Sequence, residues 1–295
     1  MNRTKPVGLK SLVLIAASLL VPVVAPAQKN NKEPTPTGPL ITRTTPRHET
    51  YRLQPGGTVT LSAAPAGSII IEGWQQNVVD LTATIELQGP TEQALDQLAV
   101  LNTFGVDVDS NHISILTTGT HDRIFMKRVA KNFPKTLIGL PWKIDYHIKL
   151  PALTDLEIDA GNGPIALSGV EGALRLNAMH SDANLSLTGG LVSVLIQSGT
   201  VNLVIPGRSW HGLGAEFKLA SGNLNIDLMP GFSGDINADV LRLGEIKNSF
   251  AGLQPREGSS TASRSLSARA ASGGATLNFT VGDGTIVIKQ SGDKQ

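Results

Sequence analysis

The chain has 295 residues, 40% of them hydrophobic and 17% charged, with a formal net charge of +1 and no cysteine. The absence of cysteine excludes disulfides and lipid attachment to a leader cysteine, so an exported form must be held together by packing alone. The balanced charge gives no electrostatic argument for nucleic acid, and we expect no nucleic-acid partner.

Residues 1–27 have the pattern of a cleaved secretory signal peptide. A basic start precedes an apolar run from Leu12 to Val24, and Ala25-Pro26-Ala27 supplies a small-x-small cleavage site. The apolar run is short for a bilayer span of about 20 residues, although an uncleaved membrane anchor is the alternative. Cleavage would leave no stable transmembrane span and a mature chain with 22 basic and 24 acidic residues. The leader therefore predicts an exported protein that is periplasmic, cell-surface or extracellular.

The segment 28–46, which follows the leader, is rich in Pro, Lys, Asn and Thr and is predicted to be a flexible linker. We expect one β-rich domain over 47–290 and a short tail over 291–295. Strand-like alternation of apolar and polar residues occurs, for example, over Val78–Leu87.

One amphipathic helix is predicted over 91–104. Its apolar residues fall near helical spacing, Thr91 can cap its start, and Gly105 is expected to end it.

Two segments depart from the strand pattern and are predicted to be flexible loops, 119–140 and 252–275. The second is rich in Ser, Ala and Arg. The first is a short helix or a mobile excursion and carries a run of basic residues: Arg123, Lys127, Arg128, Lys131 and Lys135. Such a run could contact an anionic glycan or lipid, although many runs of this kind are solvated faces.

An 18-residue repeat dominates the second half of the chain. Asp155–Gly172, Ala173–Gly190 and Leu191–Arg208 align with every apolar position in register. Each unit reads as two short strands joined by a tight turn, with a small residue at the turn. A unit this short cannot bury its own apolar face and must stack on copies of itself.

The repeat extends beyond the three aligned units. It resumes at Ala215–Asp227 after an insertion of five residues, returns at 277–288, and has a looser counterpart at Gly67–Ile71. We therefore predict an all-β fold, a single-stranded β-helix (β-solenoid) with coils of about 18 residues, plus the helix near the N-terminal part. A meander of antiparallel hairpins is the alternative.

Four features occur in a fixed order along the chain: the Gly-x-Ile turns, Gly73-Trp74 after Gly67–Glu72, the helix over 91–104 and the strand Tyr146–Pro151. In these features the chain resembles the bacterial putative adhesin family of unknown function. The resemblance covers about Tyr51–Lys289 and implies an exported single-stranded β-helix domain. The family has no established catalytic residues, so none can be transferred to this chain.

Known catalytic and metal-binding motifs are missing from the sequence. It contains no nucleophile elbow, phosphate-binding loop or His-Glu-x-x-His pattern, and its six histidines lack metal-ligand spacing. Asp107–Asn111 mimics the start of a calcium loop but lacks the glycine and glutamate that such a loop needs, so a strand ending in a polar turn is favoured. We therefore predict no catalytic residues, no metal and no cofactor.

Three residues are candidates for binding. Trp210 and His211 fall in the five-residue insertion, where exposed aromatic side chains could bind sugars or proteins, and Trp74 follows a strand and a glycine. The alternative for both tryptophans is packing over a flank or an end of the coil stack. Asn184, Asn202 and Asn225 share one outward column and are predicted to form a structural amide ladder.

The sequence supports three functional hypotheses. The first is a non-enzymatic exported solenoid for cell-surface or envelope attachment, with an envelope glycan or protein as its unknown partner. The second is an envelope-stress or signalling accessory that binds another envelope protein. The third, a polysaccharide-acting β-helix enzyme, is disfavoured because no acidic cluster stands out in the outward columns.

Overall fold

The computed structural model describes residues 38–130, 132–255 and 263–292. The chain divides into two units, Met1–Pro34 and Thr35–Gln295, and every described residue belongs to the second. The predicted signal peptide and the first part of the predicted linker therefore lie outside the described residues. Among the residues that are described, no helix is long and apolar enough to cross a membrane.

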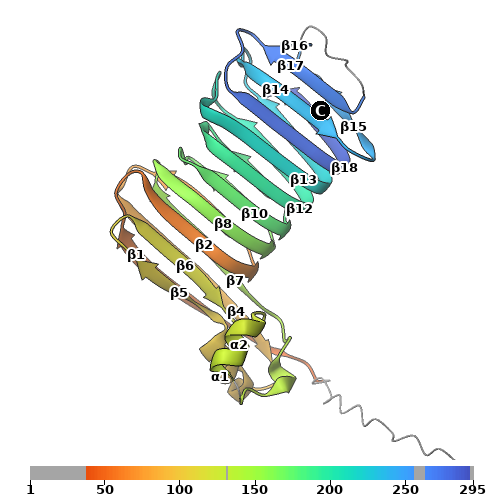
Figure 1. The fold of residues 1–295 in the computed structure, drawn as a ribbon. Coiled ribbons are helices and arrows are strands. Elements are labelled where there is room, and N and C mark those ends of the chain that lie inside the picture. Colours follow the sequence, from red (N-terminus) through yellow and green to blue (C-terminus); the bar gives the residue numbers. More distant parts are fainter. Residues whose placement is uncertain (1–37, 131, 256–262, 293–295) are drawn as a thin grey trace, which may run out of the picture. The chain divides into compact units, whose positions relative to one another are not determined.

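The described residues form mostly β-strand, joined into one 18-stranded sheet, with two α-helices and one 3-10 helix (Figure 1). The strands are β1 (Ile41–Arg52), β2 (Gly57–Ala66), β3 (Ile69–Trp74), β4 (Val78–Gly89), β5 (Thr103–Val108), β6 (His112–Thr118), β7 (Trp142–Pro151), β8 (Thr154–Asn162), β9 (Ile165–Ser168), β10 (Leu174–His180), β11 (Ala183–Ser186), β12 (Gly189–Ile205), β13 (His211–Leu228), β14 (Gly234–Val240), β15 (Gly244–Asn248), β16 (Leu253–Pro255), β17 (Ser265–Ala270) and β18 (Thr276–Gln290). The helices are α1 (Glu92–Leu101), α2 (Arg123–Val129) and η1 (Lys135–Leu137).

The predicted repeat stacks in parallel, one copy on the next. In the first half of each copy, Leu156 of β8 lies beside Leu174 of β10, which lies beside Val192 of β12, so each residue pairs with the one 18 positions on. In the second half, β9, β11 and the end of β12 pair in the same way. The predicted register is therefore confirmed for these copies, and the alternative of antiparallel hairpins is wrong for them.

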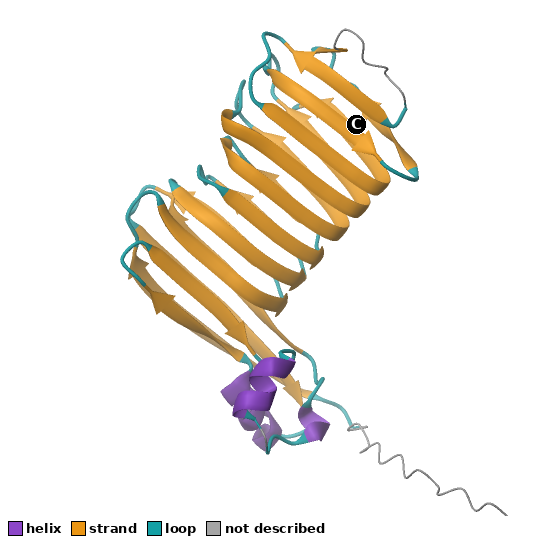
Figure 2. Cartoon of the chain, in the orientation of Figure 1, coloured by secondary structure: helices purple, strands orange, loops and turns teal. Residues whose placement is uncertain are grey.

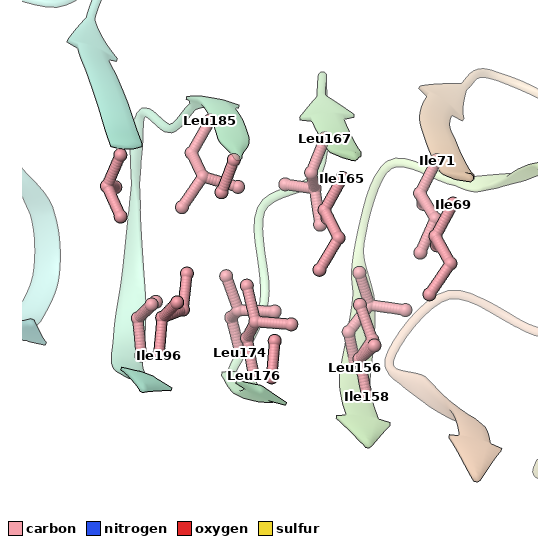
Figure 3. Packing of buried hydrophobic residues seen from close by; sticks show 14 of the residues in the cluster. Ile69, Ile71, Leu156, Ile158, Ile165, Leu167, Leu174, Leu176, Leu185 and Ile196 are labelled. Carbon is pink, nitrogen blue, oxygen red and sulfur yellow. The ribbon is translucent and has the colours of Figure 1, made fainter. Parts of the chain in front are cut away.

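The inward columns of the stack form the hydrophobic core (Figure 3). Leu156, Leu176, Leu185 and Ile196 are each at most 2% exposed. Successive side chains of a strand point to opposite faces, so burying one set leaves the alternate positions outside. The sequence alternation thus separates core columns from surface columns.

Two segments are inserted into the stack out of chain order. β18, the last strand, lies between β13 and the pair β14–β15, with Ala215 beside Leu277. Near the other end, β2 and β3 lie between β8–β9 and β6–β7, with Ile69 beside Ile165. The predicted repeat copies at 277–288 and Gly67–Ile71 are confirmed in register, although their spatial neighbours do not follow chain order.

Both ends of the stack change to antiparallel pairing. At the N-terminal end β1 pairs with β4, β4 with β7, and β5 with β6. At the C-terminal end β17 pairs with β14 and β16 with β17. The helices gather at the N-terminal end (Figure 2), where α1 packs against β4.

Two predicted boundaries need correction. The linker does not extend to Pro46, because β1 begins at Ile41 and pairs with β4 along its whole length. The helix over 91–104 is confirmed with Thr91 as its cap, but it ends at Leu101 because β5 begins two residues later and includes Gly105. Pairing with an antiparallel strand thus makes part of the predicted linker a β-strand. The start of the next strand, and not Gly105, decides where the helix ends.

The segments predicted as flexible loops contain regular structure. In 119–140, Asp122 accepts hydrogen bonds from the backbone N–H groups of Ile124 and Phe125 at 2.8 and 3.1 Å, which caps α2. In 252–275, β17 pairs with β14 over Gly234–Asp239. Local side-chain capping and a sheet partner therefore order much of both segments.

Candidate functional site

Trp210 and His211 are separated by burial. Trp210 is 5% exposed, and its indole N–H donates to the Gly190 carbonyl at 3.1 Å. His211 is exposed at the start of β13. The ring of Trp210 is not available to a ligand, so its prediction as a binding residue needs correction: the apolar ring packs into the core and its polar atom bonds the neighbouring coil.

Trp74 lies at a different place, on the outer face of β3. Its indole N–H donates to the Val78 carbonyl at 2.8 Å, and the Lys149 ammonium lies 6.0 Å from the centre of the ring. The ring is half-buried, so part of its surface remains accessible. Of the two predicted tryptophans, Trp74 is therefore the one that still offers a surface for binding.

The strands beside β3 bring ionisable side chains to the same face. Glu72, two residues before Trp74, lies 3.4 Å from His147 of β7. In the adjoining strands, His48 of β1 contacts Asp80 of β4 at 2.9 Å. Sequence reasoning missed this group, because it depends on β1, β4, β7 and β3 being neighbours. The alternation in Lys143–Leu150 was the available signal, since it places His147 and Lys149 on one face.

A shallow groove runs from Glu72 across the repeat copies. One part has a volume of about 290 Å³ and a second part about 250 Å³, and the two share Asn202 and Val204. Besides these two, the outward side chains along it are Ile70, Glu72, Ala166, Ser168, Asn184, Ser186, Asn225, Asp227, Val287 and Lys289. We call this surface the polar groove.

The predicted asparagine ladder lies within the polar groove and is confirmed. The Asn202 amide donates to Asn184 Oδ1 at 2.9 Å, and the Asn225 amide donates to Asn202 Oδ1 at 2.8 Å. Each of these bonds uses one of the two N–H donors of an amide and one of the two lone pairs of the accepting oxygen. The ladder therefore fixes the side chains in register while leaving hydrogen-bonding capacity for a ligand.

Charges of opposite sign lie at the far end of the polar groove. The Lys289 ammonium lies 3.5 Å from Asp227 Oδ1, and that oxygen has no hydrogen-bond partner. With Glu72 at the other end, the groove combines carboxylate, amide and hydroxyl groups with small apolar patches. Such a surface can recognise a polar polymer by hydrogen bonding.

The structure of the calcium-like segment is a tight turn. Asp107 and Val108 end β5, the Asp109 N–H donates to the His112 carbonyl at 2.8 Å, and the Ser110 N–H donates to Asp109 Oδ1 at 2.5 Å. The favoured interpretation of a strand ending in a polar turn is confirmed. Within the described ranges, no group of His, Asp and Glu could hold a metal ion.

Comparisons with known proteins give only distant likenesses. No family model matches the chain, and no curated protein matches it. A putative cell adhesion protein from Clostridium sporogenes is similar at a TM-score of 0.45 and 15% identity, over 84% of this chain and 100% of that one. A putative adhesin from Bacteroides fragilis is similar at 0.32 and 13%, over 83% and 97%. A putative adhesin from Parabacteroides distasonis is similar at 0.26 and 11%, over 83% and 97%. At these values the likeness identifies neither a family nor a function.

Proposed function

We propose that this chain is an exported, non-enzymatic β-solenoid that attaches to a glycan of the cell surface or envelope through the polar groove. The observation that carries the proposal is the parallel register, which places Asn184, Asn202 and Asn225 in one hydrogen-bonded column. Neighbouring strands of a sheet lie about 4.8 Å apart. A polymer lying across the strands therefore meets an asparagine amide on three successive strands, β11, β12 and β13.

The chemistry of the groove favours a saccharide over an apolar ligand. Amides, the hydroxyls of Ser168 and Ser186 and the carboxylate of Glu72 can exchange hydrogen bonds with sugar hydroxyls. Trp74, which lies on the same face two residues beyond Glu72, offers an accessible part of its ring to the apolar face of a sugar. The sequence supports export through its leader pattern, and the ordered motifs that resemble the putative adhesin family agree with a surface role.

Glycan-array binding of matched single variants tests this proposal. Asn202→Ala removes the central amide of the ladder, and we expect about a tenfold loss of affinity for the bound glycan, as for the loss of one or two good polar contacts. Asn177→Ala is the matched control, because Asn177 also donates to the neighbouring coil, to Asp159 at 2.8 Å, but outside the groove. Equal losses in both variants would contradict a site in the polar groove.

A pull-down from envelope extract distinguishes the remaining hypotheses. Saturable glycan binding with no protein partner supports attachment. Capture of one envelope protein without glycan binding would favour the signalling accessory instead. Turnover of a polysaccharide by the purified chain would overturn the non-enzymatic assignment.

A further inference from the structure

The helical end of the sheet exposes apolar side chains that the rest of the fold does not cover. Ile124 of α2 is 79% exposed, Val100 of α1 is 76% exposed and Val129 is 50% exposed. Val100 and Val129 line a groove of about 570 Å³ between the two helices, whose floor includes Leu101 and Phe133. We call α1, α2 and the segment up to Ile138 the helical cap.

Cations are concentrated around these apolar residues. Between residues 123 and 135 the sequence has five basic residues and no acidic one, in a chain whose net charge is only +1. Lys131 lies outside the described residues. The other four basic residues are exposed: Arg123, Lys127, Arg128 and Lys135. None of these four forms an ion pair with a described residue. Their charge is therefore available to an external partner.

The nearby carboxylates are already engaged. Glu92 and Asp96 of α1 both pair with Arg43 of β1, Asp96 at 2.7 Å. Asp122 caps α2, and hydrogen bonds from the Phe125 and Ile124 backbone lower the pKa of its carboxyl. The cap therefore presents a surface with excess positive charge.

Helix geometry places the apolar and basic groups together. At 3.6 residues per turn, Arg123, Lys127, Ile124 and Arg128 occupy one outward arc, with Ile124 between Lys127 and Arg128. Phe125 and Met126 occupy the opposite side and are half-buried. Ile124 therefore projects among three cations on the side of α2 that faces away from the rest of the fold.

We propose that the helical cap docks on an anionic lipid bilayer, with Ile124 entering the interface and Arg123, Lys127 and Arg128, which share its outward arc, meeting lipid phosphates. Charge complementarity selects this occupant, since each Lys or Arg close to an anionic membrane contributes favourably. The highly exposed side chains project outward, which suits a soft interface better than the surface of a folded protein. The proposal concerns the helical cap and is independent of glycan binding in the polar groove.

Co-sedimentation with lipid vesicles tests the proposal. We expect the full chain to bind vesicles made of equal parts phosphatidylglycerol and phosphatidylcholine more tightly than vesicles of phosphatidylcholine alone, and raised salt to weaken that binding. Lys127→Gln with Arg128→Gln should weaken it by about fivefold for each cation. Ile124→Ser should weaken it by roughly tenfold through the lost apolar contact.

Matched controls locate the effect. Leu213→Ser removes an apolar side chain that is 82% exposed outside the cap, and Lys218→Gln with Lys247→Gln removes two exposed cations outside the cap. Both controls should bind like the parent, and every variant retains Met1–Ala27, so any leader contribution is shared.

Three outcomes would overturn the proposal: no preference for the anionic vesicles, losses in the controls equal to those in the cap variants, or a loss with the charge variant but none with Ile124→Ser. The last result would mean that lipid phosphates bind the chain through charge alone, without entry of Ile124 into the interface. Asn202→Ala should leave vesicle binding unchanged, so failure here and failure of the polar-groove proposal are separable.

Discussion

The repeat stack and the helical cap differ in how their strands pair and in what covers them. In the stack, β8, β10 and β12 pair in parallel at a constant offset of 18 residues, so each coil supplies the hydrogen-bond partners of the next. At the helical cap the strands turn antiparallel and two helices are added. Among the described residues, β1 pairs only with β4 and β5 only with β6, so these strands form edges of the sheet at this end.

The difference explains where exposed chemistry accumulates. In the stack, identical register keeps one face of every strand in the core and leaves the alternate positions outside, where polar side chains predominate but Leu191, Leu195 and Leu213 are also exposed. At the cap the chain is no longer constrained by a repeating neighbour, and Val100 and Ile124 remain largely uncovered. Regular coils thus provide a uniform surface, whereas the termination provides a local and chemically distinct one.

Among the substitutions that test this comparison, Leu203→Asp should lower the unfolding free energy most, because Leu203 is 1% exposed in an inward column of the stack. An unpaired charge there should cost more than about 4 kcal/mol and prevent stable folding. Circular dichroism during urea unfolding measures the loss. Val100→Asp at the cap and Leu195→Asp on the outer side of β12 should unfold like the parent. If Leu203→Asp also did so, the inward column would be wrong.

Replacing a glycine of the stack by alanine should cause a smaller loss of stability, which can be compared with the same change outside the stack. Gly222 joins the two halves of a coil at φ +134°, and an added Cβ would lie 1.8 Å from the Gly199 carbonyl oxygen of the next coil. Gly222→Ala should therefore lower the unfolding free energy by roughly 2–4 kcal/mol.

Gly105→Ala is the matched substitution in the terminating part of the sheet. No atom lies within 4 Å of its added Cβ, and Gly105 does not have a positive φ. Alanine should be neutral or stabilise by up to about 1 kcal/mol there. Equal thermal shifts in the two variants would show that coil stacking imposes no special constraint at Gly222.

The smallest expected effect is a pH dependence that begins beside the helical cap. Partial desolvation lowers the pKa of His121, which is still exposed over part of its surface, against the opposing effects of Asp122 and a hydrogen bond to the Ala63 backbone. Its ring lies 5.3 Å from the ring of Trp142. The unfolded chain then binds a proton more readily than the folded chain. The His121 contribution is therefore present above a pH of about 6.5 and is lost as the pH falls from there towards its lower folded pKa.

His121→Gln should flatten this part of the stability profile, measured as the melting temperature between about pH 7 and pH 5. His211→Gln is the control, because His211 is exposed at the start of β13 in the stack. A parent profile that His121→Gln leaves unchanged would remove His121 as its cause.

Prediction from sequence succeeded where one pattern was repeated. Leu156, Leu174 and Val192 share a column because each copy carries the same apolar spacing, and the asparagine ladder follows from the same alignment. For Trp210 the sequence left binding and packing both open, and the structure agrees with packing: the ring is 5% exposed and its N–H donates to the Gly190 carbonyl. The group around Trp74 was missed, since its members come from four separate strands.

The sequence by itself determined the repeat: its 18-residue period, its inward and outward columns and the helix that Thr91 caps. These features depend on residues close in the chain or on exact repetition. Only the tertiary structure decided that β18 lies between β13 and β14–β15, that β2 and β3 lie between β6–β7 and β8–β9, and that the helical cap leaves Ile124 exposed. The repeat copies have nearly the same surfaces for pairing, so the local pattern does not decide which copy lies beside which. Their order in space depends on how the two ends of the sheet are completed.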